Sequence, residues 1–227
     1  MMRVQKYLSE QGILSRRTAE TYIRAGKILI NGKKAEIGQQ IDPKKDTVEV
    51  VGQTEASFTT VLVNKPRGVA SSRSAQDGKT VYDLFPQFGK LHIAGRLDKE
   101  SEGLLILTDD GILAKHLTSD QHIIEKEYEV HVQEKIRGPE LAQMERGLKL
   151  KDGMTLPAKA DKIGPNRYTI VLREGRNHQI RRMADAVQLT VTRLTRKRIG
   201  GVKTGRLHTG EFRELTPAEI KSFKATQ

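Results

Sequence analysis

The sequence contains no cysteine and no tryptophan among its 227 residues, and aromatic residues make up only 4%. The absence of cysteine excludes disulfides, thiol catalysis and thiolate metal sites, which agrees with a reducing compartment. Long apolar runs are also missing, because the longest, residues 104–107, is far shorter than the roughly 20 residues that cross a bilayer. Residues 1–12 lack the apolar core of a secretory signal. We therefore expect a cytoplasmic protein without a membrane span.

Positive charge is what the chain has in excess. Lys and Arg number 40 against 28 acidic residues, a net charge of +12. Such a charge favours polyanions, because each neutralised phosphate releases condensed counterions. Nucleic acid is the first candidate partner and an anionic membrane surface the second. Between Arg173 and Arg206 ten basic residues stand against two acidic ones, so we predict an RNA cradle there, with contacts from Arg176, Arg182, Arg196, Lys197 and Arg198.

Residues 1–52 are predicted to form a separate small domain. Val4, Tyr7 and Leu8 share one helical face, and Ser15 is placed to cap a second helix. Asn31-Gly32 between two strand-like runs predicts a hairpin, because both turn residues of the favoured type need positive φ. The second helix carries the basic residues Arg16, Arg17, Arg24 and Lys27. In isolation a solvated helix face is the better explanation for them, but the net charge favours phosphate binding.

The rest of the chain divides into a linker at residues 53–58 and a second domain at residues 59–227. Strand-like and helical runs in the second domain do not alternate strictly, which predicts an α+β fold on a mixed or antiparallel sheet. The expected strands are 60–63, 103–107, 127–132, 168–172 and 190–194, and the expected helices are 112–117, 139–148, 178–187 and 217–223.

Three segments carry residues suited to catalysis: 94–111, 125–130 and 173–183. Asp98 lies between the cations Arg96 and Lys99, which would keep a carboxylate ionised as a nucleophile requires, although a turn aspartate explains it as simply. Tyr128 alternates with two glutamates on a strand and is either a half-buried core residue or a stacking partner for a base. His178 has no His or Cys partner at ligand spacing, so we expect it to fix its loop by a hydrogen bond.

Other reaction classes find no support in the sequence. It has no Gly-rich phosphate loop followed by Lys-Ser or Lys-Thr, and no dinucleotide fingerprint opening a helix after a strand. No His, Asp and Glu cluster has metal-site spacing. We therefore expect neither a metal nor a coenzyme.

Taken together, the segments resemble the RsuA/RluB/RluE/RluF family of pseudouridine synthases over nearly the whole chain. Residues 3–50 resemble the alpha-L RNA-binding module of a small-subunit ribosomal protein. The matching motifs are Asn64-Lys65-Pro66-Arg67-Gly68, Gly95-Arg96-Leu97-Asp98, Lys126-Glu127-Tyr128 and the run from Gly175 to Met183. Arg-Leu-Asp alone is a weak signal, but the motifs in this order and at these distances are highly specific.

The resemblance implies a role for each motif residue. Asp98 would be the nucleophile, attacking either the sugar or the base of a uridine that has left its stack. Tyr128 would stack on the base and help to remove its carbon-5 proton, and Ile180 would wall the pocket. Arg181 would pair with Asp98, and Arg96 would fill the gap left by the flipped base. No metal or coenzyme takes part.

The resemblance also implies ribosomal RNA as the substrate and a monomeric enzyme. The residues around Asp98 resemble the large-subunit branch, whereas the chain length resembles the small-subunit enzyme. Two rival hypotheses stay open from the residues alone: a non-catalytic RNA-binding or ribosome-assembly factor, and a DNA-binding protein that reads bases from the second helix.

Overall fold

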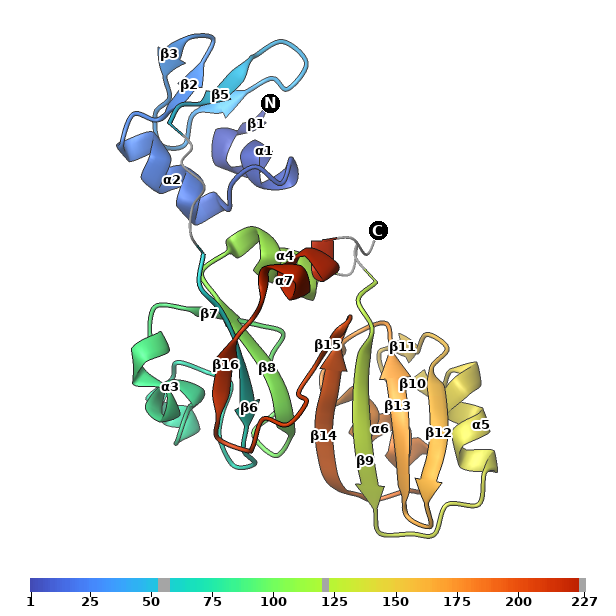
Figure 1. Ribbon diagram of the computed structural model, residues 1–227. Helices are drawn as coiled ribbons and strands as arrows, with labels where there is room; N and C mark the ends of the chain where they lie inside the picture. The colour runs from blue at the N-terminus through green and yellow to red at the C-terminus, as the bar shows by residue number, and fades with distance from the viewer. Residues whose placement is uncertain (53–57, 120–122, 225–227) are drawn as a thin grey trace.

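The computed structural model describes residues 1–52, 58–119 and 123–224. Its N-terminal part is a pair of helices packed beside short strands (Figure 1). Ser15 caps the second helix by accepting a hydrogen bond from the Thr18 amide at 3.2 Å, and the turn residues Asn31 and Gly32 have φ of 51° and 75°. The predicted helix–helix–hairpin unit is therefore confirmed. The elements are β1 (Met2–Arg3), α1 (Val4–Glu10), α2 (Arg16–Arg24), β2 (Ile28–Ile30), β3 (Lys33–Lys34), β4 (Gln40–Ile41) and β5 (Val48–Val50).

The second part is built on one nine-stranded mixed sheet, as the α+β prediction requires. Its main path runs β12-β13-β9-β14-β8-β6-β16, with β15 paired to β14 and β7 to β8. The strands are β6 (Thr60–Lys65), β7 (His92–Ala94), β8 (Glu102–Thr108), β9 (Lys126–Val132), β12 (Lys159–Gly164), β13 (Arg167–Leu172), β14 (Val191–Ile199), β15 (Val202–Lys203) and β16 (Phe212–Glu214).

The sheet consists of two halves that meet at β14 and β8, a parallel pair whose register joins Thr195 to Glu102 and Arg196 to Gly103. Figure 1 shows α5 and α6 behind the β12–β14 half, and α3, α4 and α7 around the other half. Strand β8 is buried on both faces, which explains the uninterrupted apolar run from Leu104 to Leu107. The remaining elements are α3 (Val81–Leu84), α4 (Gly111–Thr118), α5 (Pro139–Arg146), α6 (Gln179–Ala186), α7 (Pro217–Lys224), the 3-10 turns η1 (Ala75–Asp77) and η2 (Pro86–Phe88), and the hairpin β10 (Lys149–Leu150) and β11 (Gly153–Met154).

Every strand and helix expected in the second part is present, but β14 continues five residues past its expected end, to Ile199. Strand β12 and the shorter elements α3, β7, β10, β11, β15 and β16 are not among the expected ones. Strand β12 and the added part of β14 are dominated by charged and polar side chains, because β12 is an edge strand and one face of β14 is open. Apolar alternation is weak in such strands, so periodicity does not reveal them.

The two parts touch through α4 and β7. Lys115 Nζ donates to the Ser9 carbonyl at 3.2 Å, and Arg17 Nη1 lies 3.3 Å from Nε2 of His92. A Cβ atom added to Gly111 would lie 2.4 Å from Ser15 Cβ, so only glycine fits at the start of α4. The predicted linker 53–58 lies outside the described residues except for Phe58, and the domain boundaries at residues 52 and 59 stay a prediction.

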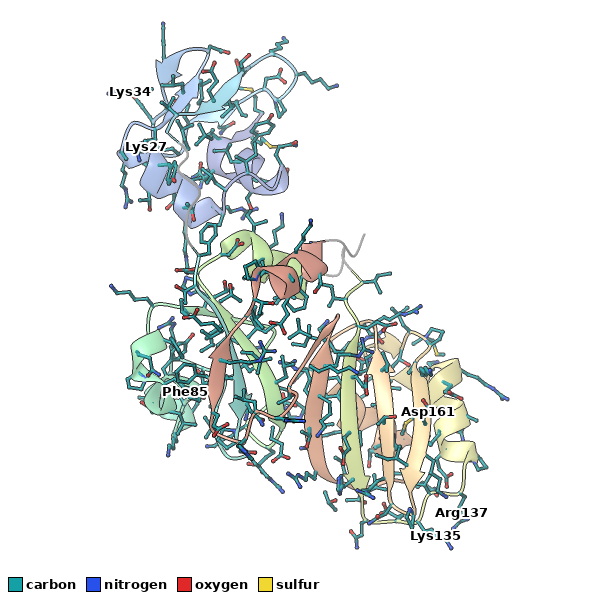
Figure 2. All side chains as sticks on the ribbon, in the orientation of Figure 1. Lys27, Lys34, Phe85, Lys135, Arg137 and Asp161 are labelled. Atoms are coloured by element: carbon teal, nitrogen blue, oxygen red, sulfur yellow. The ribbon has the colours of Figure 1, made fainter. Side chains whose placement is uncertain are left out.

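Charge lies at both ends of the molecule. Figure 2 shows Lys27 and Lys34 on the same side of the N-terminal part, and Lys135 and Arg137 at the opposite end of the sheet.

Within the described ranges no helix is long and apolar enough to cross a bilayer. Across the same residues, no group of three or more His, Asp or Glu side chains is arranged to hold a metal ion.

Candidate active site

Asp98 lies on the loop between β7 and β8, and a buried lysine at the end of β6 anchors this loop. Lys65, at the end of β6, has no exposed surface. Its Nζ donates to the carbonyls of Val69 at 2.7 Å, Pro66 at 3.0 Å and Lys99 at 3.4 Å. A lysine ammonium has three protons to donate, so these acceptors satisfy it. Lys65 thereby connects the strand end to the loop residue that follows Asp98.

A buried arginine anchors the same loop from the other half of the sheet. Arg196, on β14, is only 2% exposed. Its guanidinium donates to the carbonyls of Leu104 at 2.7 Å, Gly95 at 2.8 Å and Arg96 at 3.4 Å. The expectation that Arg196 contacts RNA from the surface is therefore wrong. Nothing in the local sequence marks which face of β14 is buried, so the sequence alone does not distinguish Arg196 from a surface cation.

The loop opens into a cleft of about 840 Å³ that brings the three predicted segments together. Asp98, Tyr128 and Ile180 all line it, and Arg96 stands exposed at its rim. The Asp98 side chain is 34% exposed, so its carboxylate is open to a ligand in the cleft. The size suits a nucleoside with neighbouring backbone, since sites for small ligands span roughly 300–1,000 Å³.

Tyr128 projects from β9 on the face opposite Glu127 and Glu129, as the alternation predicted. It is half-buried and packs against two apolar clusters, one in each half of the sheet. The ring therefore belongs to the edge of the core and also forms a wall of the cleft, while its stacking on a base stays a prediction.

The partner of Asp98 differs from the expected one. His178 Nε2 lies 3.5 Å from Asp98 Oδ1. Arg181 instead donates to the carbonyls of Glu100 at 3.2 Å and Val191 at 3.4 Å, and no Arg181–Asp98 ion pair occurs among the described residues. The prediction that Arg181 pairs with Asp98 is corrected accordingly. Arg181 lies on α6, three residues after His178. Its hydrogen bond to the Glu100 carbonyl holds the loop two residues after Asp98.

The basic stretch from Arg173 to Arg206 is also less available to RNA than its charge suggested. Many of its cations are already paired within the protein, several of them on the open face of the sheet. These pairs are Arg176–Glu174 at 2.9 Å, Arg182–Asp152 at 2.8 Å, Arg193–Glu102 at 2.5 Å, Lys197–Glu129 at 3.6 Å and Arg198–Glu127 at 2.7 Å. Most of the acidic partners lie far away in sequence, so a local charge count could not reveal them.

Burial of Lys65 gives the site a pH dependence that can be measured. Desolvation lowers the pKa of Lys65 from 10.5 to about 8, although Glu102 and Asp98 act in the opposite direction. Between pH 8 and 10.5 the unfolded chain therefore binds more protons at this position than the folded one, and stability from this group rises with pH.

We expect the free energy of unfolding of wild type to rise relative to that of Lys65→Met between pH 8 and 10.5, by at most about 3 kcal/mol. Below pH 8 the difference between the two proteins should be constant, since Lys65 is protonated in both states. Urea denaturation of both proteins at a series of pH values measures it. A difference that is flat across this range would contradict the depressed pKa.

A carboxylate, a tyrosine and a basic loop from three separate segments thus surround one cleft, in a chain that begins with a small helical domain. This combination defines the class of protein. Residues 59–186 match the RNA pseudouridylate synthase family, and residues 2–48 match the S4 domain. The chain belongs to the RNA pseudouridylate synthase family and is an enzyme of that class.

Relatives match along the full length. The chain is 37% identical to the ribosomal large subunit pseudouridine synthase B of Bacillus subtilis, covering 99% of this chain and 96% of that protein. It is 36% identical to the dual-specificity RNA pseudouridine synthase RluF of Escherichia coli K12, covering 96% of this chain and 77% of that one. A solved pseudouridylate synthase structure superimposes with a TM-score of 0.73 at 32% identity, covering 98% of this chain and all of the other. Membership sets aside the non-catalytic and DNA-binding hypotheses.

Proposed function

We propose that the protein isomerises one uridine of ribosomal RNA to pseudouridine, with Asp98 as the nucleophile. The observation that carries this proposal is the convergence of Asp98, Tyr128 and Ile180 on one cleft. Asp98 comes from the loop before β8, whereas Tyr128 on β9 and Ile180 on α6 come from the other half of the sheet. Such convergence from distant segments is typical of a reaction site rather than of core packing alone.

The reaction exchanges one bond of the uridine for another. The target base leaves its stack and enters the cleft, at a cost of a few kcal/mol. The Asp98 carboxylate bonds to the nucleoside, at the anomeric carbon or on the base, and the bond between that carbon and nitrogen-1 breaks. The uracil turns, carbon-5 bonds to the anomeric carbon, and Asp98 is released. Carbon-5 loses its proton and nitrogen-1 gains one, so no oxidant or energy source is consumed.

The neighbouring side chains have supporting roles in this scheme. Tyr128 stacks on the uracil and assists removal of the carbon-5 proton. Ile180 closes the apolar wall, and Arg96 occupies the gap that the flipped base leaves in the RNA. His178 takes the position beside the carboxylate that the family resemblance had implied for Arg181.

RNA capture falls mainly to the N-terminal domain in this proposal. Arg16, Arg17, Arg24 and Lys27 are exposed on or beside α2. Arg17 also lies against His92 of the synthase domain, so this face continues onto the second part of the chain. Lys197 on β14 is half exposed despite its 3.6 Å contact with Glu129, and it adds a cation on the open face of the sheet. Basic residues in such an arrangement hold phosphates without reading sequence.

We further propose large-subunit ribosomal RNA as the substrate, because the residues around Asp98 resemble that branch and a full-length relative is named for the large subunit. The test incubates purified protein with unmodified small- and large-subunit RNA separately and maps pseudouridine by chemical labelling and primer extension. One new site in the large-subunit RNA is the expected result. A site in the small-subunit RNA alone would overturn the subunit assignment, and no site in either would overturn free ribosomal RNA as the substrate.

A further inference from the structure

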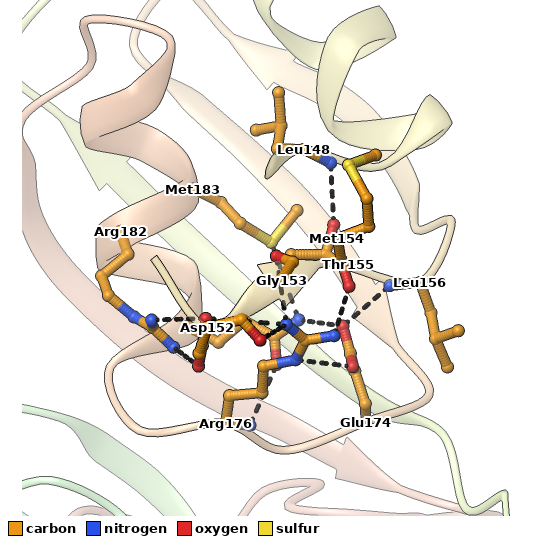
Figure 3. A network of polar contacts seen from close by, with 11 residues as sticks. Leu148, Asp152, Gly153, Met154, Thr155, Leu156, Glu174, Arg176, Arg182 and Met183 are labelled. Carbon is orange, nitrogen blue, oxygen red and sulfur yellow. Dashed lines mark hydrogen bonds and ion pairs between the residues drawn. The ribbon is translucent and has the colours of Figure 1, made fainter. Parts of the chain in front are cut away.

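The hairpin β10–β11 has no part in the reaction just described, yet a network of polar contacts connects it to α6 and to the loop before α6 (Figure 3). Asp152 lies at its turn. Arg182 on α6 donates to both carboxylate oxygens of Asp152, Nη1 to Oδ1 at 2.8 Å and Nη2 to Oδ2 at 2.9 Å. A two-point contact of this kind defines orientation as well as distance.

A second arginine extends the network into the loop before α6. Arg176 Nη1 donates to the carbonyls of Asp152 at 3.4 Å and Gly153 at 3.3 Å, and Nη2 donates to the carbonyl of Met154. Its Nε donates to Glu174 at 2.9 Å. The hairpin backbone therefore fixes the Arg176 side chain, which in turn holds Glu174 in the loop before α6.

The same loop is closed on itself around His178. Gln179 Nε2 donates to Glu174 Oε1 at 2.6 Å, and the Arg176 amide donates to Gln179 Oε1 at 3.0 Å. Glu174 also accepts from the amide of Leu156, just beyond the hairpin, at 2.9 Å. The residues on both sides of His178 are thus held by contacts that reach back to the hairpin.

His178 needs such a frame because of its own backbone conformation. It has φ of 50° and ψ of 28°, in the left-handed region that non-glycine residues seldom adopt. Conformations of this kind persist where the surroundings determine them, and they occur often at active sites. The side chain that results lies 3.5 Å from Asp98.

We propose that Asp152 is a positioning residue for catalysis: through Arg182 and Arg176 it holds the loop that places His178 beside Asp98. The proposal rests on the role of Asp98 proposed above. The Asp152 and Arg182 side chains are 45% and 30% exposed, so their ion pair adds little to folding stability. Its larger effect is on geometry, because a displacement of about 1 Å at a reacting group lowers a rate by up to about 100-fold.

The experiment compares wild type with Asp152→Asn, Asp152→Glu and Arg182→Gln on the ribosomal RNA that wild type modifies. Asp185→Asn is the matched control, since it removes a carboxylate from the exposed side of the same helix as Arg182. The single-turnover rate at saturating enzyme, the Kd for RNA and the melting temperature are measured for each protein. We expect Asp152→Asn to lower the rate about tenfold or more, with Kd and melting temperature unchanged.

Two further results are expected if the network acts as one unit. Asp152→Glu should recover most of the rate, and the double variant Asp152→Asn/Arg182→Gln should be no slower than either single variant. A wild-type rate for Asp152→Asn would overturn the proposal. So would a change in Kd at an unchanged rate, which would make Arg182 an RNA contact, or a rate that falls only together with the melting temperature. Product from Asp98→Asn is a separate result, which would overturn the nucleophile and not the network.

Discussion

Asp98→Asn is expected to lower pseudouridine formation by at least about 10⁴-fold, to below detection, while RNA affinity stays nearly unchanged. The amide has almost the size and shape of the carboxylate, but it does not form the covalent bond that the proposed reaction requires. The loop should keep its fold, because it is held through backbone carbonyls that Lys65 and Arg196 bind and not through the Asp98 carboxylate.

The measurement is a single-turnover assay with binding recorded on the same RNA. Asp161→Asn is a suitable control, since Asp161 lies on β12 in the far half of the sheet (Figure 2) and its loss removes the same charge. The control should turn over as wild type does. Product from Asp98→Asn at a rate near that of the control would show that another group attacks the uridine.

The cleft could be predicted from the sequence because its parts are carried by short contiguous motifs. Asp98, Tyr128 and Ile180 each lie in a run whose local pattern is visible, and family resemblance orders the runs along the chain. Strand β14 pairs with β9 on one side and with β8 on the other, and this pairing brings the three runs together at the cleft. Continuous apolar runs also identify the buried strands β6 and β8, which are apolar on both faces.

The contacts between the motifs could not be predicted in the same way. The distance between Asp98 and His178 depends on a left-handed backbone conformation at a histidine, for which the sequence has no signal. Lys65 looks like any strand-end lysine until burial is known. The hairpin that carries Asp152 consists of two strands of two residues each, too short for periodicity, and its role depends on arginines about 25 to 30 positions later in the chain.

Surface charge was the least predictable feature, because a cation's sequence position says nothing about whether it is already paired. Arg198 pairs with Glu127, more than 70 positions away, and Arg193 pairs with Glu102, 91 positions away. Net charge still identified the class of partner correctly, since the chain belongs to the RNA pseudouridylate synthase family. It did not identify which cations contact that partner.

Arg196 provides the second prediction of a large effect, on stability. We expect Arg196→Met to lower the free energy of unfolding of the synthase domain by about 3–5 kcal/mol, because carbonyls that Arg196 satisfies in the interior would lose their donor. The side chain also crosses the seam at β14 and β8. That seam has little room for adjustment, since a Cβ atom added to Gly103 would lie 2.3 Å from the Arg196 carbonyl oxygen.

Arg193→Met is the matched control for this variant, being the same substitution on the same strand. The Arg193 side chain is 56% exposed, and its partner Glu102, which is 12% exposed, keeps a hydrogen bond from Thr195 Oγ1 at 2.8 Å, so the loss of Arg193 should cost about 1–2 kcal/mol, less than the loss of Arg196. Urea denaturation followed by circular dichroism measures both proteins, and RNA binding is recorded below the transition. If Arg196 instead served as a surface contact for RNA, its replacement would weaken binding and leave the transition where it is in the control. Loss of stability with binding retained by the folded fraction would establish that this arginine, drawn from the most basic stretch of the chain, holds the two halves of the sheet and the Asp98 loop together.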